Sequence, residues 1–429
     1  MTRIETSTRC GCDEYVQLER RALLRAAWKA GAAAVVSAPA WLPRMAFAAD
    51  ENSDRDLLVC VFLRGGADGL TTCVPHGDGE YYNARNTIAV PRPDDSGPNK
   101  AIDLDGFFGL PPALAGLKPI YDTGQLAVVH ATGLNHPTRS HFEAQDLMET
   151  GTSAAVDTAG WLARHLFGVT APEEIKLRAM AASEAIPRSL GGAPSTVAVP
   201  NIDQYGLVGR GQTTAERQSL LGSLYEGSVE PVKTGAANVI DTIDLIAQIS
   251  ANGYTPTGGA IYPESDWGVG LRSIAQIAKA QVGLEVACID LGGWDTHAFQ
   301  GTLDGHLFNL MTEFSAGLTA FHTDMQDCMH SLTILVMSEF GRRVAENGSL
   351  GCDHGHGNAL FVLGGNVNGG QVYADWPGLH PDVLDDQRDL AITTDYRDIL
   401  SEILIKRAAN PNLDLVFPGY APTFQGIVM

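Results

Sequence analysis

The sequence predicts an α/β fold in which helices cover both faces of a mostly parallel β-sheet. Short apolar runs recur along the chain, such as LLVCVFL at 57–63, LAVVHA at 126–131 and LTILVM at 332–337. Such runs are typical of strands that are buried on both faces. Segments with helical features, such as 303–325, alternate with these runs. This alternation indicates an α/β class.

The elements follow from the same patterns taken in order. We expect strands at 57–63, 126–131, 196–199, 284–291, 332–337 and 359–363. We expect helices at 111–121, 140–150, 161–166, 214–225, 238–249, 269–281, 303–325 and 393–408. Proline can start the first of these helices, and Thr394 can cap the last. Residues 151–280 are less regular, and we expect an insertion or cap there within one domain at 49–429.

The first 48 residues resemble an export signal rather than part of the fold. Arg20 and Arg21 precede an Ala-rich apolar stretch at 26–40, and Ala46–Phe47–Ala48 supplies an A-x-A cleavage site. This order is typical of a twin-arginine signal peptide. The alternative is a short amphipathic helix of the mature protein. No later 18-residue apolar run is seen, so we expect a periplasmic or extracellular product without a transmembrane segment.

The charge balance restricts the class of partner. The whole chain carries a formal −21, with +3 in residues 1–48 and hence −24 in the remainder. Such acidity argues against nucleic acid as a partner. It would repel anionic substrates unless a cation reversed the local sign, although adaptation for solubility or salt is an alternative explanation. The five cysteines after residue 48 are odd in number and lack C-x-x-C spacing, which indicates neither a disulfide framework nor a zinc ribbon.

Residues 331–357, SLTILVMSEFGRRVAENGSLGCDHGHG, combine a strand with candidate metal ligands. Glu339 follows the apolar run, and Asp353, His354 and His356 lie on a glycine-rich loop. Carboxylate and imidazole are ordinary ligands of zinc and related metals. The alternative is a polar surface loop.

Other acidic groups follow other predicted strands. Asp68 comes after the first strand, and Asp295 and His297 come after the strand at 284–291. Ligands of open α/β sheets bind at the carboxyl ends of strands, so we expect these side chains to meet there with Glu339. Carboxylates gathered at one edge repel each other unless a cation lies among them. The alternative for each residue alone is an N-cap or turn role.

Ser140 stands at the start of a predicted helix. With Glu143 it matches a capping box. The same position suits a nucleophile, because a helix N-terminus attracts an anionic ester and a nearby metal lowers the pKa of a hydroxyl. Thr138 is a second candidate nucleophile. Anion-binding candidates nearby are Arg64, Arg139 and His141.

Several longer motifs together carry a family resemblance. They are RALLRAA, FLRGGADGL, HPTRSHFEAQDLMETGT, GGWDTH, SEFGRR, DHGHGNALFVLGG and TTDYRDIL. The chain resembles the bacterial family called domain of unknown function 1501, which is similar to the alkaline phosphatase and sulfatase superfamily. The resemblance implies a three-layer αβα sandwich that binds one or two metals. It also implies that Ser140 is the nucleophile and that the metal ligands come from Asp68, Asp295, His297, Glu339, His354 and His356.

The chain departs from that superfamily at two places. Glu339–Phe340 stands where Asp-His is usual, which puts a second metal in doubt. Cys73–Val74–Pro75–His76–Gly77 lacks the arginine of the sulfatase motif C-x-P-x-R, which argues against a formylglycine sulfatase.

The leading hypothesis is an exported metal-dependent hydrolase that acts on a phosphate or related oxyanion ester. Its cofactor would be a divalent metal, zinc first, with Mn, Ca or Mg as alternatives. Its partner would be a small anionic ester or an envelope component. The competing hypothesis is a non-catalytic envelope protein that retains the fold for binding or assembly. A redox metalloprotein is a third possibility, but the sequence lacks thiolate or haem spacing.

Overall fold

The structure is a computed structural model, and it describes residues 55–154, 158–171, 175, 177–207, 213–229, 232–251 and 253–429. The expected signal peptide at 1–48 lies outside the described residues. Across the described residues, none of the helices combines the length and the apolarity that a membrane span requires.

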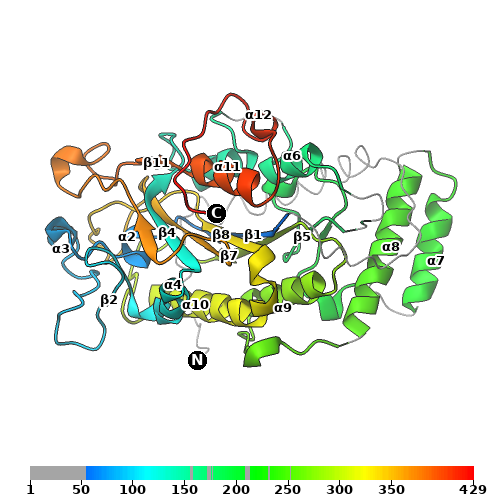
Figure 1. Cartoon of the computed structure of the whole chain (residues 1–429), viewed down its shortest axis with the longest axis horizontal. Coiled ribbons are helices and arrows are strands. Elements are labelled where there is room, and N and C mark those ends of the chain that lie inside the picture. The colour runs from blue at the N-terminus through cyan, green and yellow to red at the C-terminus, as the bar shows by residue number, and fades with distance from the viewer. Residues whose placement is uncertain are drawn as a thin grey trace, which may run out of the picture.

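A large β-sheet forms the centre of the described chain (Figure 1). Its strands follow the order β10-β4-β9-β8-β1-β7-β5-β6, with β11 beside β4. Their bounds are β1 Leu57–Arg64, β4 Leu126–Gly133, β5 Ala179–Ala181, β6 Thr196–Ala198, β7 Val286–Gly292, β8 Leu332–Met337, β9 Asn358–Gly364, β10 Gln371–Tyr373 and β11 Thr394–Asp395. The pairings are parallel except those of β9 with β4 and β8. A separate antiparallel pair joins β2 (Ile102–Asp103) and β3 (Gly109–Leu110).

Helices cover both faces of the sheet, which gives three layers (Figure 1). One face carries α4 (Lys118–Asp122), α9 (Asp266–Lys279) and α10 (His306–Asp324), and the other carries α6 (Trp161–Gly168), α11 (Tyr396–Lys406) and α12 (Leu413–Val416). The remaining α-helices are α2 Gly69–Thr72, α3 Gly79–Ala84, α5 His141–Thr150, α7 Thr214–Tyr225 and α8 Val232–Ala251. The predicted three-layer α/β fold with a mostly parallel sheet is therefore confirmed.

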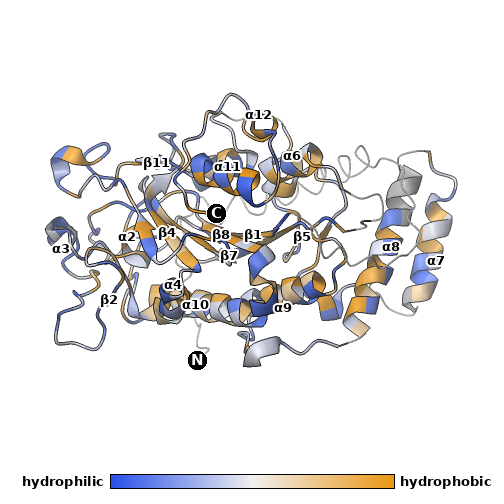
Figure 2. Ribbon diagram, in the orientation of Figure 1, coloured by the Kyte–Doolittle hydropathy of each residue, from blue (hydrophilic) through white to orange (hydrophobic). Residues whose placement is uncertain are grey.

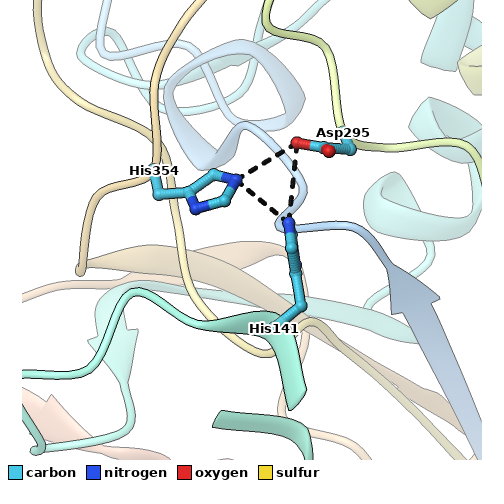
Figure 3. Close-up of side chains that lie close together, drawn as sticks. All are labelled: His141, Asp295 and His354. Atoms are coloured by element: carbon cyan, nitrogen blue, oxygen red, sulfur yellow. Dashed lines mark hydrogen bonds and ion pairs between the residues drawn. The ribbon is translucent and has the colours of Figure 1, made fainter. Parts of the chain in front are cut away.

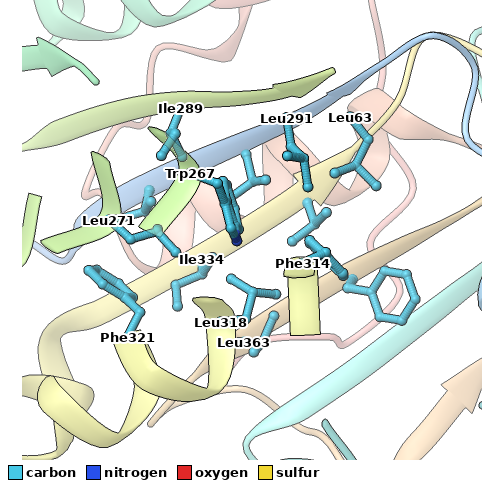
Figure 4. Packing of buried hydrophobic residues seen from close by; sticks show 14 of the residues in the cluster. Leu63, Trp267, Leu271, Ile289, Leu291, Phe314, Leu318, Phe321, Ile334 and Leu363 are labelled. Atoms are coloured by element: carbon cyan, nitrogen blue, oxygen red, sulfur yellow. The ribbon is translucent and has the colours of Figure 1, made fainter. Parts of the chain in front are cut away.

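Strand β1 shows why the central runs are apolar throughout. Val59, Val61 and Leu63 point into one core cluster, while Cys60 and Phe62 point into the cluster on the opposite face. Each residue of a strand between two helical layers is thus buried, whichever way its side chain points. Figure 2 shows the resulting apolar sheet, and Figure 4 shows one of its two cores.

The segment 151–280 contributes to the core as well as to the periphery. It supplies β5 and β6 to the sheet and α6 and α9 to the two helical layers. Helices α7 and α8 pack side by side at one end of the molecule, on the right in Figure 1. The buried carboxylate of Asp324 on α10 fixes the end of this segment, because it accepts hydrogen bonds at 2.7 Å from the hydroxyls of Tyr254 and Tyr262. The boundaries of an insertion stay a prediction.

The antiparallel strand β9 has a direct effect on the site. Because β9 runs against its neighbour β8, the end of β8 and the start of β9 lie at the same edge of the sheet. The loop between them, residues 338–357, therefore folds over the edge where the parallel strands β1 and β7 also end.

Candidate metal centre

Three side chains from distant parts of the chain converge at this edge (Figure 3). His141 is the first residue of α5, Asp295 follows β7, and His354 lies in the loop before β9. The Nε2 atoms of His141 and His354 are 3.0 Å apart. Asp295 Oδ1 lies 3.6 Å from Nε2 of His141 and 3.2 Å from Nε2 of His354. We call these three residues, with His297, the His–Asp cluster.

His297 occupies the more open side of the cluster. Its Nε2 lies 2.9 Å from Nε2 of His354 and 3.0 Å from Asp295 Oδ1. Its side chain keeps 32% of its surface exposed, whereas that of His141 keeps 2%. The cluster is thus closed at His141 and reaches solvent at His297.

The outer nitrogen of each imidazole faces a hydrogen-bond acceptor. Nδ1 of His141 lies 2.7 Å from Glu339 Oε1, and Nδ1 of His297 lies 3.1 Å from Asp353 Oδ1. Nδ1 of His354 lies 2.8 Å from the backbone oxygen of Arg139. A carboxylate or carbonyl oxygen accepts but does not donate, so each Nδ1 carries a proton. In the neutral rings the three Nε2 atoms are then bare, and that of His354 lies close to the other two.

Such a set of donors fits a divalent cation. Ligand atoms held 2.0–2.1 Å from zinc in a tetrahedron lie about 3.3 Å apart. The ligand atoms of His141, His354 and Asp295 are 3.0, 3.2 and 3.6 Å apart, close to that value. Metal-bound histidines usually donate their other N–H to a carboxylate or backbone carbonyl, as all three do here. Without a cation, a proton must separate the bare nitrogens. The residues present therefore fit a metal, with His141, His354 and Asp295 as its grouped candidate ligands and His297 beside His354 and Asp295 on the open side.

The charges around the cluster act on its titrating groups. Burial would lower the pKa of His141, but hydrogen bonds and charges from Asp295 and Glu339 outweigh burial and raise that pKa to about 9. Burial would raise the pKa of Glu339, but His141 and Gln145 outweigh it and bring that pKa to about 2. Burial would likewise raise the pKa of Asp295, but the cluster histidines and Arg342 hold it well below its usual range. In the metal-free protein His141 is thus the histidine of the cluster whose protonated, positively charged form is favoured.

Arg342 holds the loops around the cluster together. Its side chain is fully buried, and Nη2 donates to Asp295 Oδ1 at 2.7 Å. Nε donates to the backbone oxygen of Gly66 at 2.6 Å, and Nη1 donates to that of Cys352 at 2.9 Å. One guanidinium thus ties the loop after β1 to the loop before β9, and its positive charge stabilises the ionised form of Asp295.

Two glycines are required by close backbone contacts at this edge. Gly65 has φ +120°, and an added Cβ would lie 2.6 Å from the backbone nitrogen of Asp295. An added Cβ at Gly355 would lie 2.4 Å from the carbonyl carbon of Arg342. Both positions exclude larger residues for steric reasons, and Gly65 also needs a backbone conformation that other residues rarely adopt.

Glu339, which we predicted to be a metal ligand, lies behind His141 instead. Its Oε1 is contacted by Nδ1 of His141, by the N–H of Gly65 at 2.9 Å and by Nε2 of Gln145 at 2.7 Å. Its Oε2 accepts from the hydroxyl of Ser338 at 2.9 Å. The carboxylate is fully buried and its oxygens are used, so it orients His141 rather than joining the grouped donors. Asp353 similarly lies behind His297.

Asp68, also predicted as a ligand, is engaged elsewhere. Its two carboxylate oxygens accept from Arg85, Oδ2 at 2.6 Å and Oδ1 at 2.9 Å, and both side chains are completely buried. Thr71 and Gln300 donate to Oδ2 as well. The structure does not bring Asp68 to the grouped donors, and Arg85 neutralises its charge.

His356 is not among the grouped donors, and two of the predicted anion-binding residues form ion pairs. Nδ1 of His356 lies 2.5 Å from Asp385 Oδ2. Arg64 makes hydrogen bonds of 3.0 Å to both oxygens of Glu149. Nε of Arg139 donates to the buried Asp389 at 2.9 Å. These three side chains already have partners, so none is presented freely to an anion. His141, the third predicted anion-binding residue, lies inside the cluster.

Ser140 is the N-cap of α5, but its side chain makes no capping hydrogen bond. The predicted capping box is therefore wrong. Its partner Glu143 instead accepts from the hydroxyl of Thr138 at 2.7 Å. The Thr138 hydroxyl is thus engaged in a hydrogen bond to Glu143. The half-buried Ser140 lies in sequence between Arg139 and His141, both of which contact His354 of the cluster.

Sequence reasoning missed three supporting residues. Gln145 lies in the motif HFEAQDL, one helical turn after His141. Arg342 lies in the motif SEFGRR, three residues after Glu339. A helical spacing of four from His141 is a signal that could have identified Gln145. Arg85 lies in a region at 75–105 without periodicity, and its sequence neighbourhood carries no signal.

The chain is similar to several solved structures, among them the two that follow, and it matches one family. The first structure is the C-terminal periplasmic domain of EcEptC from Escherichia coli in complex with Zn, with a TM-score of 0.32, 11% identity, and coverage of 76% of this chain and 77% of that one. The second is the phosphonate monoester hydrolase of Agrobacterium radiobacter, with a TM-score of 0.34, 9% identity, and coverage of 86% and 79%. No curated protein matches the chain. The sequence model of one family matches residues 126–412, and the chain therefore belongs to the family described as protein of unknown function, DUF1501.

Proposed function

We propose that the protein is an exported metal-dependent hydrolase of phosphate or related oxyanion esters. The observation that carries the proposal is the tautomeric arrangement of the cluster, with three Nδ1 atoms held by acceptors and the Nε2 atoms turned toward Asp295. Zinc suits three imidazoles and one carboxylate better than Mg or Ca, which prefer oxygen ligands. We propose one ion, held by His141, His297, His354 and Asp295.

When bound, a divalent cation would polarise an ester oxygen and offset the negative charge of the oxyanion. The protein supplies the other parts. Ser140 offers a hydroxyl that no capping bond engages, next to the cluster residue His141. Its oxygen would attack the phosphorus or sulfur, the alcohol would leave, and water would then release the oxyanion from Ser140. Glu339 and Asp353 hold two of the imidazoles in the required tautomer.

The test combines metal analysis with an ester panel. Purified protein is loaded with zinc, its metal content is measured, and hydrolysis of p-nitrophenyl phosphate, phosphonate and sulfate is followed. We expect turnover that depends on zinc and that falls at least about a thousandfold in Ser140→Ala. Thr138→Ala serves as the matched hydroxyl control. Unchanged turnover in Ser140→Ala would remove the nucleophile from the proposal.

One observation favours the non-catalytic alternative. Arg64 and Arg139, the guanidinium groups expected to bind an oxyanion, are both paired with carboxylates. If the function is metal-supported binding in the envelope, zinc content stays the same while no ester is turned over. In that case Ser140→Ala changes neither metal content nor stability.

A further inference from the structure

A cavity of about 400 Å³ opens next to the His–Asp cluster. Its wall includes Asp353, whose Oδ1 contacts Nδ1 of His297 at 3.1 Å. The cavity is thus one side chain away from the most exposed cluster residue. Its lining comes from α3, from the loop before β9 and from residues 379–388.

Charged groups of both signs line this cavity. Arg343 and Arg388 supply guanidinium groups, and Glu80, Glu346 and Asp353 supply carboxylates. The Glu346 carboxylate is held by Thr87 and by the backbone of Ile88, so its place in the wall is fixed. A purely anionic ligand would meet the carboxylates, and a purely cationic ligand would meet the arginines. An apolar chain would leave both kinds of group without solvent.

Arg343 can donate further hydrogen bonds at the edge of the cavity. Its Nη1 contacts Asp353 Oδ2 at 3.3 Å, a long hydrogen bond, and its side chain keeps 35% of its surface exposed. A guanidinium that reaches solvent and makes a long hydrogen bond can still donate to a ligand oxygen. The amide side chains of Asn83, Asn347 and Gln387 add both donors and acceptors.

We propose that the cavity binds the organic portion of the ester and that this portion is rich in hydroxyls, as in a sugar or polyol. A hydroxyl both donates and accepts without carrying a charge, so it can satisfy the guanidinium, amide and carboxylate groups together. The apolar atoms of Val344, Leu379 and Leu384 offer contact for the C–H face of a ring. The volume is in the range of pockets that take small molecules. This inference rests on the proposed function for the position of the ester itself.

The experiment measures binding separately from turnover. Dissociation constants for the zinc-loaded protein are measured by NMR titration with the 6-phosphates and 6-sulfates of glucose, galactose and N-acetylglucosamine. Butyl phosphate and butyl sulfate serve as ligands with the same charge and no hydroxyls, and O-phosphoethanolamine serves as a zwitterion. Asn83→Leu and Gln387→Leu alter the cavity, and Asn309→Leu on the exposed side of α10 is the matched control.

We expect at least one hexose ester to bind about tenfold more tightly than its butyl counterpart, as one or two added hydrogen bonds would give. That preference should shrink to about twofold in Asn83→Leu or Gln387→Leu and persist in Asn309→Leu. Equal binding of hexose and butyl esters would overturn the inference, as would tighter binding of the zwitterion. If p-nitrophenyl esters are not hydrolysed, the proposed function fails, while the binding comparison still decides the inference.

Discussion

Glu339 contacts Nδ1 of His141 at 2.7 Å, and both side chains are buried. This pair links the end of β8 to the start of α5 and turns Nε2 of His141 toward Asp295 and His354. The carboxylate therefore fixes both the orientation of the ring and the nitrogen that carries the proton. The behaviour of the cluster toward metal and toward pH depends on this contact.

Removing one imidazole should remove the metal. We expect the wild-type protein to hold about one zinc ion, and His354→Ala to bind zinc at least a hundredfold more weakly, because one nitrogen donor and the contact to Arg139 are lost. Metal content after dialysis against a weak chelator measures this. The exposed His330 offers the control His330→Ala, which should keep its zinc. Equal zinc in both variants would contradict the assigned ligands.

Zinc affinity should depend on pH. Below about pH 9 the metal-free protein carries a proton on His141 that zinc must displace. The apparent affinity should therefore rise about tenfold per pH unit between pH 6 and 8 and level off above pH 9, with about one proton released per ion near pH 7. Chelator competition at several pH values and proton release into weak buffer test this. An affinity that is independent of pH would contradict it.

The imidazole of His141 also affects the stability of the metal-free protein. The pKa of His141 is raised on folding from 6.5 to about 9. The resulting stabilisation is fully present below pH 6.5 and is lost as pH rises toward 9. Denaturant unfolding of metal-free protein should show this loss, and His141→Gln should remove it. An unchanged pH slope in His141→Gln would assign the effect to other groups.

Glu339→Gln should weaken metal binding without unfolding the protein. The amide oxygen can still accept from His141 and Gly65, and the Ser338 hydroxyl can donate instead to the backbone oxygen of Leu63 at 2.7 Å. Loss of the negative charge should lower the pKa of His141 and reduce zinc affinity about 10- to 100-fold. Zinc affinity with circular dichroism as a folding control measures this. Unchanged affinity would mean that the contact only packs the loop.

Asp68→Asn should destabilise the fold and leave zinc in place. The substitution breaks a buried ion pair and leaves Arg85 without a charged partner, which should cost about 3–5 kcal/mol in the free energy of unfolding. Denaturant unfolding measures the loss. The double variant Asp68→Asn/Arg85→Met should recover part of it. Folded Asp68→Asn protein that lacked zinc would show that Asp68 is a ligand.

More of the fold than of the candidate site could be predicted from the sequence. Buried runs such as 57–63 and 332–337 stand out because both faces of the sheet are covered, and the observed strands begin and end close to the expected residues. The direction of β9 could not be predicted, because pairing depends on neighbours that a local pattern does not contain. The short strand β5 is three residues long and has no pattern of its own. Asp395 rather than Thr394 caps α11, since its side chain accepts from the N–H of Arg397.

For the site, the sequence indicated which groups reach the sheet edge but not which charges are already neutralised. Asp295, His297 and His354 meet as their positions after β7 and before β9 suggested. Asp68 and Glu339 have equally suggestive positions, yet Arg85 neutralises one and His141 contacts the other. Both partners lie more than ten residues away in sequence, so no local pattern reveals them. Their roles as ligands stay predictions to be tested by the variants above.

The three converging donors belong to α5, to the loop after β7 and to the loop before β9, so they span residues 141 to 354. The complete set of donors is therefore available only after residue 354 has been synthesised. The donors meet only after β8 and β9 have joined strands made much earlier. An ion can therefore be held by the complete set only once the sheet has brought these loops together.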